Sequence, residues 1–199
     1  MKLFGTDGIR GKFNESPINH DQLIKIGYAF AKSMFGDKSG KILISNDGRE
    51  SCPIIESALS QGIHHQGSMV FHLGLYPTPA LSVYLNSTVL TSGACAGIQI
   101  TASHNPYHDN GVKFFDNHGY KINADLEKKI EENFKVFNEK INVEKNQILT
   151  TNDPDLFNLH YINFIDDFFR LKMHDVKPPQ KKLNIIVDCA NGATSKVIS

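Results

Sequence analysis

The sequence predicts an α/β protein: a three-layer α/β/α domain with a mixed, mostly parallel sheet carrying one antiparallel strand, plus the start of a second similar domain. Four short apolar runs alternate with segments of helical periodicity, which is typical of strands joined through crossover helices. One further strand follows turn-forming residues alone, so we expect it to return antiparallel. A last apolar run has no neighbour, and because a lone strand cannot build a sheet it indicates a second domain that has only begun.

The individual elements follow from caps and periodicity. Asn19 is the expected N-cap of the first helix, with Gln22 as its capping-box partner and Gly36 as its C-terminal cap. Further strands are expected at 41–45, 68–73, 96–101, 112–115 and 183–188, and further helices at 51–63, 78–85, 126–137 and 155–172. The last of these helices is apolar over most of its circumference, so we expect it to be buried between layers or domains. The predicted domains are 1–152, and 153–199 with the connecting helix and the lone strand.

Composition excludes several classes of function. Lys+Arg and Asp+Glu both total 21, so net charge favours neither a nucleic-acid nor a membrane partner. The three cysteines, Cys52, Cys95 and Cys189, are odd in number and far apart, which indicates neither a disulfide framework nor a zinc site. No apolar run approaches the roughly 20 residues of a membrane span, and no signal peptide precedes Phe4. We therefore expect a cytoplasmic protein.

Two segments are candidate anion sites. Phe4–Gly11 holds three glycines that permit close approach to a ligand, and Arg10 among them suits bidentate phosphate binding; a plain loop is the alternative. Asp47 and Arg49 follow a buried strand, at the end where open α/β sheets place ligands; a local Asp–Arg pair is equally compatible with the pattern.

The stretch around Ser103 carries the clearest chemistry. A buried strand gives way at Ser103 to turn formers, and Asn110-Gly111 then turns the chain into a strand that holds Lys113. This hairpin is expected to set Ser103 beside Lys113. Ser103 could then be a nucleophile or phosphate carrier, assisted by His104 and Lys113; in the alternative interpretation these residues only form a turn.

Three motifs in order resemble the α-D-phosphohexomutase family. They are Phe4–Gly11, Thr101–Pro106 with Asn110–Lys113, and Val187–Ala193. The resemblance implies a phosphoserine at Ser103, Mg²⁺ bound through its phosphate, and reversible phosphate transfer between the 6- and 1-hydroxyls of a hexosamine phosphate through a bisphosphorylated sugar. It also implies that Arg10 and Lys113 neutralise phosphate charge, while His104 and Lys113 assist proton transfer. The ordinary pKa of lysine is about 10.4, so Lys113 is expected to act more by its charge than as a base.

The resemblance also shows what the sequence lacks. Family members are more than twice as long, with four domains, and their Asp-Gly-Asp metal loop, sugar-selecting loop and distal phosphate loop have no counterpart here. The chain alone is therefore expected to be inactive. A mannose or glucose phosphate as substrate, a silent phosphate-binding module and a homodimer all remain open.

Overall fold

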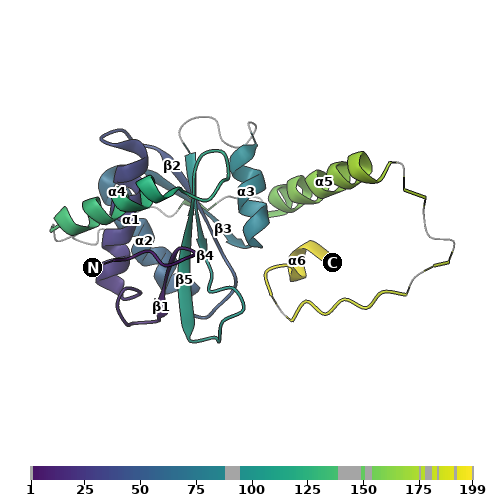
Figure 1. The fold of residues 1–199 in the computed structure, drawn as a ribbon, viewed down its shortest axis with the longest axis horizontal. Coiled ribbons are helices and arrows are strands. Elements are labelled where there is room, and N and C mark those ends of the chain that lie inside the picture. Colours follow the sequence, from purple (N-terminus) through teal and green to yellow (C-terminus); the bar gives the residue numbers. More distant parts are fainter. Residues whose placement is uncertain are drawn as a thin grey trace.

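The computed structural model describes residues 2–87, 95–138, 149–150, 154–174, 176–177, 181–182, 184–190 and 192–198 (Figure 1). The strands are β1 (Ile9–Lys12), β2 (Lys41–Asn46), β3 (Met69–Leu75), β4 (Cys95–Ile100), β5 (Asp109–Phe115) and β6 (Leu149–Thr150). The helices are α1 (His20–Phe35), α2 (Cys52–Gln66), α3 (Thr78–Asn86), α4 (Ala124–Val136), α5 (Pro154–Met173) and α6 (Ser195–Ile198).

The described strands form one mixed sheet in the order β1-β5-β4-β2-β3-β6. β5 runs antiparallel to both of its neighbours, and every other adjacent pair is parallel. The predicted mostly parallel sheet with one antiparallel strand is therefore confirmed. Sequence reasoning missed β1 and β6, because a four-residue edge strand with a glycine and a two-residue strand carry too little apolar alternation to be recognised.

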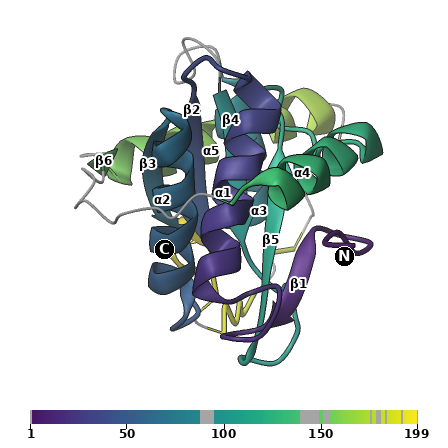
Figure 2. The same ribbon diagram turned by 90° about the vertical axis from the view of Figure 1, so that its left-hand side faces the viewer.

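Helices cover both faces of the sheet. α1, α2 and α4 lie on one face, and α3 with the start of α5 lies on the other (Figures 1 and 2). Each face has its own apolar cluster: Ile44, Val112 and Phe114 belong to the first, and Leu43 and Phe115 to the second. Successive side chains of a strand point to opposite faces, so burial of both faces produces the nearly continuous apolar strands of the sequence.

The α1 helix begins as predicted and packs very closely on α2. The side chain of Asn19 accepts a hydrogen bond from the backbone N–H of Gln22 (3.1 Å). Further along, a Cβ added to Gly62 of α2 would lie 1.9 Å from the carbonyl oxygen of Ile24 in α1. The two helix backbones are therefore in contact, and only glycine fits at this crossing.

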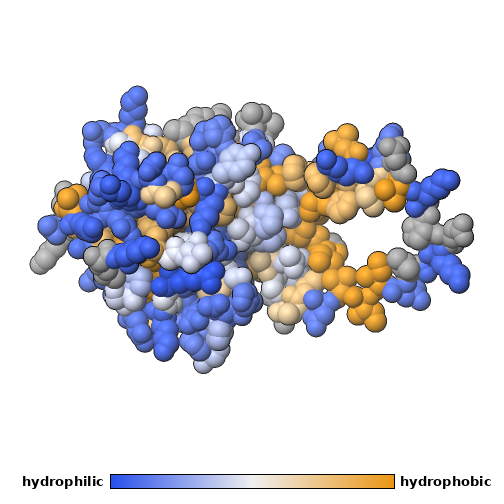
Figure 3. Space-filling model, viewed as in Figure 1, coloured by the Kyte–Doolittle hydropathy of each residue, from blue (hydrophilic) through white to orange (hydrophobic). Residues whose placement is uncertain are grey.

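The C-terminal part differs from the prediction. Phe157 packs under α3, but Leu159 is 56% exposed and Phe168 49%, so the expected burial of this helix is wrong for most of its length. Residues 184–189 form no strand, and Ile186 is 97% exposed. Both features need a second apolar surface or a partner strand, and none lies against them in the described part of the chain. Figure 3 shows this region as an apolar area.

Two further predictions concern the domain boundary and membrane spans. The domain boundary between 152 and 153 lies outside the described residues and stays a prediction. Among the helices that the structure describes, none is both long and apolar enough to cross a membrane.

Candidate active site

The site lies at the carboxyl ends of two neighbouring parallel strands inside the sheet, β2 and β4. Asn46 at the end of β2 pairs with Ile100 at the end of β4, and the backbone N–H of Asp47 donates to the carbonyl of Ile100 (3.1 Å). Because the strands are adjacent and in register, the loops that follow them leave side by side. This topology brings Arg49 next to Ser103 across more than fifty residues of sequence.

Ser103 stands exposed in the loop after β4. Its φ of 59° lies in the left-handed region, and its backbone N–H donates to Oγ1 of Thr101 (2.9 Å), which holds the turn. Within the described residues, the polar neighbour of its Oγ is Nδ1 of His104 at 3.4 Å, a long contact. The hydroxyl is therefore presented to solvent with an imidazole beside it.

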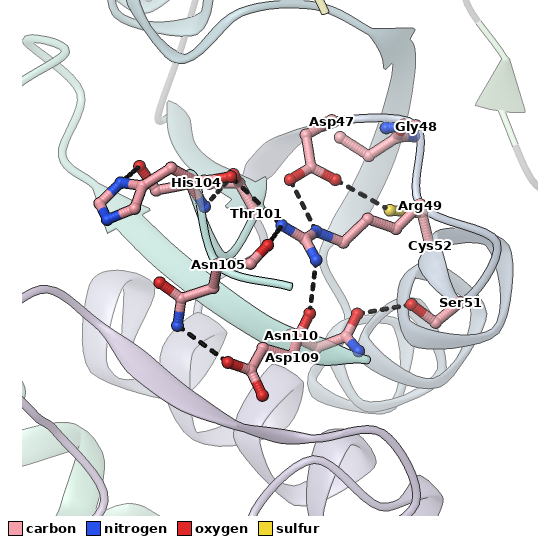
Figure 4. Close-up of polar contacts among 12 residues, drawn as sticks. Asp47, Gly48, Arg49, Ser51, Cys52, Thr101, His104, Asn105, Asp109 and Asn110 are labelled. Carbon is pink, nitrogen blue, oxygen red and sulfur yellow. Dashed lines mark hydrogen bonds and ion pairs between the residues drawn. The ribbon is translucent and has the colours of Figure 1, made fainter. Parts of the chain in front are cut away.

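The side chain of Arg49 extends into the same loop (Figure 4). It makes five hydrogen bonds, all as donor: to Oδ2 of Asp47 (3.0 Å) and to the carbonyls of Ser103 (3.2 Å), Asn105 (3.0 Å), Pro106 (2.6 Å) and Asp109 (2.9 Å). Its side chain is only 12% exposed. From the sequence, Arg49 could be a ligand-binding residue or half of a local Asp–Arg pair. The pair is present, and the four carbonyl contacts were not predicted.

Further contacts tie the loop to its surroundings. Nδ2 of Asn105 donates to Oδ2 of Asp109 (3.0 Å), closing the loop on itself. The hydroxyl of Ser51 donates to Oδ1 of the buried Asn110, which links the end of the loop to the start of α2 (Figure 4). The loop is thus anchored at both ends.

The second group of predicted residues meets at a carboxylate that sequence reasoning missed. Asp7 contacts Nζ of Lys113 on β5 (2.8 Å), Nη2 of Arg10 on β1 (3.3 Å) and Nζ of Lys121 (3.3 Å). The hydrogen bond from Lys113 is the main cause that lowers the pKa of Asp7 below its usual value. Three cations around one carboxylate leave two net positive charges. The sequence offered no signal for Asp7 beyond its place in the Gly-rich stretch.

Ser103 and Lys113 belong to different groups of polar contacts. Lys113 pairs with Gln99, which precedes Ser103 by four residues, so the expectation that the hairpin sets Ser103 beside Lys113 is wrong. The reason is the length of the connection: β4 ends at Ile100 and β5 begins at Asp109, so the loop projects beyond the paired residues. Within the described residues, no hydrogen bond or ion pair joins Ser103 to Lys113 or Arg10.

An open depression of about 520 Å³ lies in front of Ser103. Its wall includes Tyr76, Gln99 and Tyr107. Gln99 is 1% exposed and is held by the hydroxyl of Ser45 and the carbonyl of Tyr76, so it is a rigid part of the wall. This volume suits a small polar molecule of the size of a sugar phosphate.

The residues around Ser103 do not form a metal site by themselves. No cluster of three or more His, Cys, Asp or Glu side chains able to hold a metal occurs among the described residues. The nearest carboxylates are occupied: Asp47 by Arg49, and Asp109 by Asn105. The described side chains therefore do not make up a full ligand set for Mg²⁺, which usually also takes phosphate oxygens and water.

Comparison with known proteins assigns the family. Residues 1–140 match the family described as phosphoglucomutase/phosphomannomutase, alpha/beta/alpha domain I. The chain belongs to this family. It is 42% identical over 196 residues to the phosphoglucosamine mutase of Marinomonas sp. (strain MWYL1), covering 98% of this chain and 41% of that protein. It is 40% identical over 193 residues to the phosphoglucosamine mutase of Yersinia pestis (strain Pestoides F), covering 97% of this chain and 41% of that protein.

Solved structures agree with the family assignment. A protein of Thermus thermophilus assigned as a phosphomannomutase superposes with a TM-score of 0.68 at 27% identity, over 85% of this chain and 36% of that one. A family protein from Burkholderia thailandensis gives a TM-score of 0.57 at 26% identity, over 67% of this chain and 30% of that one. The predicted resemblance to the N-terminal part of a phosphohexomutase is confirmed. The chain spans 41% of the length of the two curated relatives described above.

Proposed function

We propose that this chain is the phosphate-carrying part of a phosphoglucosamine mutase, with Ser103 as the carrier. The observation that carries the proposal is the exposed hydroxyl of Ser103, presented on an anchored loop at the wall of a sugar-sized depression. Its relatives at 42% and 40% identity, which match nearly the whole chain, bear that name and support glucosamine phosphate as the substrate.

The proposed reaction moves phosphate between the 6- and 1-hydroxyls of glucosamine phosphate. A sugar hydroxyl oxygen forms a bond to the phosphorus of phosphorylated Ser103 while the bond from phosphorus to Oγ breaks. The hydroxyl proton passes to Oγ, with the neighbouring His104 as carrier. Oγ then attacks the other phosphate of the bisphosphorylated sugar, that phosphate's bond to the sugar oxygen breaks, and the proton returns.

In this proposal Arg10 and Lys113 act through their positive charge and not as bases. Both already pair with Asp7, and an ion pair is made by the charged form of each side chain. The two net positive charges of that cluster would attract the phosphate on Ser103. Phosphoryl transfer depends mainly on positioning and on neutralisation of charge, so this role suffices.

Several finer points stay proposals. Mg²⁺ would bind through the phosphate on Ser103 with its other ligands from outside the described residues, and no step of the reaction above passes through it. Turnover would need the whole protein, so the chain of 199 residues alone is expected to be inactive. Mannose or glucose phosphate as substrate, a silent phosphate-binding module, a homodimer and a cytoplasmic location remain predictions.

The test is a substitution of Ser103 in the full-length protein. Ser103→Ala should abolish conversion of glucosamine 6-phosphate to the 1-phosphate, and peptide mass spectrometry should find phosphate on Ser103 of the unmodified protein. Ser39→Ala, at another exposed serine, is the matched control and should be fully active. Turnover by Ser103→Ala at more than about a tenth of the normal rate would exclude Ser103 as the carrier.

A further inference from the structure

Arg49 has no donor left for a ligand. A guanidinium carries five N–H groups, and here each has its own acceptor: one carboxylate oxygen and four backbone carbonyls. Its Nη2 donates to the carbonyl of Ser103 itself at 3.2 Å. An arginine in front of a phosphate site normally keeps its fork free for the phosphate. All five donors of Arg49 instead bond to acceptors of the protein itself.

The four carbonyls depend on that guanidinium. They belong to Ser103, Asn105, Pro106 and Asp109, and they converge on one point from a loop that is short and mostly exposed. Carbonyl oxygens carry partial negative charge, so they repel one another around an empty centre. Lysine offers three donors and no planar fork, so it cannot satisfy the same set. The shape of the loop is therefore conditional on arginine at position 49.

The partner carboxylate makes the contribution of Arg49 positional rather than electrostatic. Oδ2 of Asp47 accepts from Nε of Arg49 at 3.0 Å, and both side chains are largely buried, at 12% and 16% exposed. The pair as a whole is neutral, so it adds little net attraction for phosphate. Asp47 is itself held by its backbone N–H, which donates to the end of β4. The arrangement connects the sheet edge to the loop through one rigid side chain.

We propose that Arg49 is a positioning residue that holds the carrier serine in place in both of its states. A phosphoserine carries about 1.5 to 2 negative charges, and these leave with each transfer. A loop organised by cations that bind the phosphate would change shape at every step. A loop organised by Arg49 through its own backbone keeps Oγ of Ser103 in position whether or not phosphate is present. The consequence for turnover rests on the proposed function, whereas the consequence for loop order does not.

The first experiment measures loop order in this chain by amide hydrogen exchange. The reporters are the N–H groups of Ser103, Asn105 and Asp109, all bonded within the loop. Arg49→Lys keeps the charge but loses the fork, and should speed their exchange about tenfold or more while leaving the α1 and β4 amides unchanged. Arg170→Lys, at a 79% exposed helix position, is the matched control and should change nothing. Unchanged exchange at the three reporters would overturn the proposal.

Chemical rescue provides a second, independent variant. In Arg49→Ala, millimolar guanidinium should restore slow exchange at the three loop amides, whereas ammonium at the same concentration should not, because only guanidinium reproduces the planar donors. Equal rescue by both ions would show that charge alone orders the loop, and would overturn the positional role. Far-ultraviolet circular dichroism verifies that the variant is folded.

The last arm measures turnover in the full-length protein. Arg49→Lys should lower kcat about 100-fold with KM nearly unchanged, which is the effect of displacing a reacting group by about 1 Å. Faster loop exchange together with an unchanged kcat would overturn the positioning role. If Ser103→Ala remains active, the proposed function fails, yet the exchange and rescue experiments still decide whether Arg49 orders the loop.

Discussion

Gly8 holds the N-terminal stretch flat against β5, and its replacement by alanine is the most informative perturbation of the cation cluster. Gly8 has a φ of +83°, and an added Cβ would lie 2.3 Å from the carbonyl oxygen of Val112 and 3.3 Å from Cα of Lys113. The atoms opposite are backbone atoms of β5, which is paired on both sides, so the Gly-rich stretch would have to move away from β5. Asp7 adjoins Gly8 in sequence and would move with it, away from Lys113.

The size of the effect follows from these distances. Lengthening the 2.3 Å contact to the shortest separation that real Cβ atoms show, 3.0 Å, requires a shift of about 0.7 Å, and an ordinary contact at 3.4 Å requires about 1.1 Å. A left-handed alanine costs about 1–2 kcal/mol, and overpacking against backbone about 1–3 kcal/mol more. We expect Gly8→Ala to lower the free energy of unfolding by about 2–5 kcal/mol.

Gly5→Ala is the matched control in the same stretch. The heavy atom facing a Cβ at Gly5 is the carbonyl oxygen of Gly8 at 3.6 Å, an ordinary contact, and its φ is not positive. Urea unfolding gives the stability of each variant, and NMR titration gives the pKa of Asp7. In Gly8→Ala this pKa should rise towards its ordinary value, because the hydrogen bond from Lys113 is the main cause that lowers it.

The pH dependence has a definite sign. A carboxyl whose pKa is lowered by folding stabilises the protein above its unfolded pKa of about 3.9, and that stability is lost as pH falls through the folded value. The part of the stability loss in Gly8→Ala that comes from Asp7 should therefore disappear at low pH, leaving the steric part. If Gly8→Ala and Gly5→Ala are equally stable and share the same Asp7 pKa, the close seating of this stretch is refuted.

Three further predictions concern other parts of the molecule. Gly62→Ala should lower the free energy of unfolding by about 2 kcal/mol, since overpacking outweighs the gain of about 1 kcal/mol in helix propensity; equal urea midpoints would contradict the tight helix crossing. Lys113→Met should lower turnover of the full-length protein by orders of magnitude, and Lys113→Arg should keep more activity; equal loss in both would indicate a base instead. Iodoacetamide at about pH 8 should label Cys189 but spare Cys52 and Cys95, because burial raises the pKa of both thiols to about 11; equal labelling of all three would contradict this.

Much of the fold could be predicted because its signals are local. The cap at Asn19 and the apolar strand ending at Ile100 depend on residues a few positions apart, and so does the turn at Ser103. Strand and helix propensities, caps and turn residues act through the nearest few residues of the chain, so they are readable in order. The family resemblance came from the same kind of local motif.

Register and long-range polar contacts were decided only by the tertiary structure. The pairing of Lys113 with Gln99, rather than contact with Ser103, depends on where two strands begin and end, and no residue type encodes that alone. The four carbonyl partners of Arg49 lie more than fifty residues away, and Lys113 and Lys121, two of the partners of Asp7, lie more than a hundred away. Backbone carbonyls leave no mark in a sequence. The exposure of Ile186 shows the same rule, since an apolar segment becomes a strand only when a partner strand satisfies its backbone.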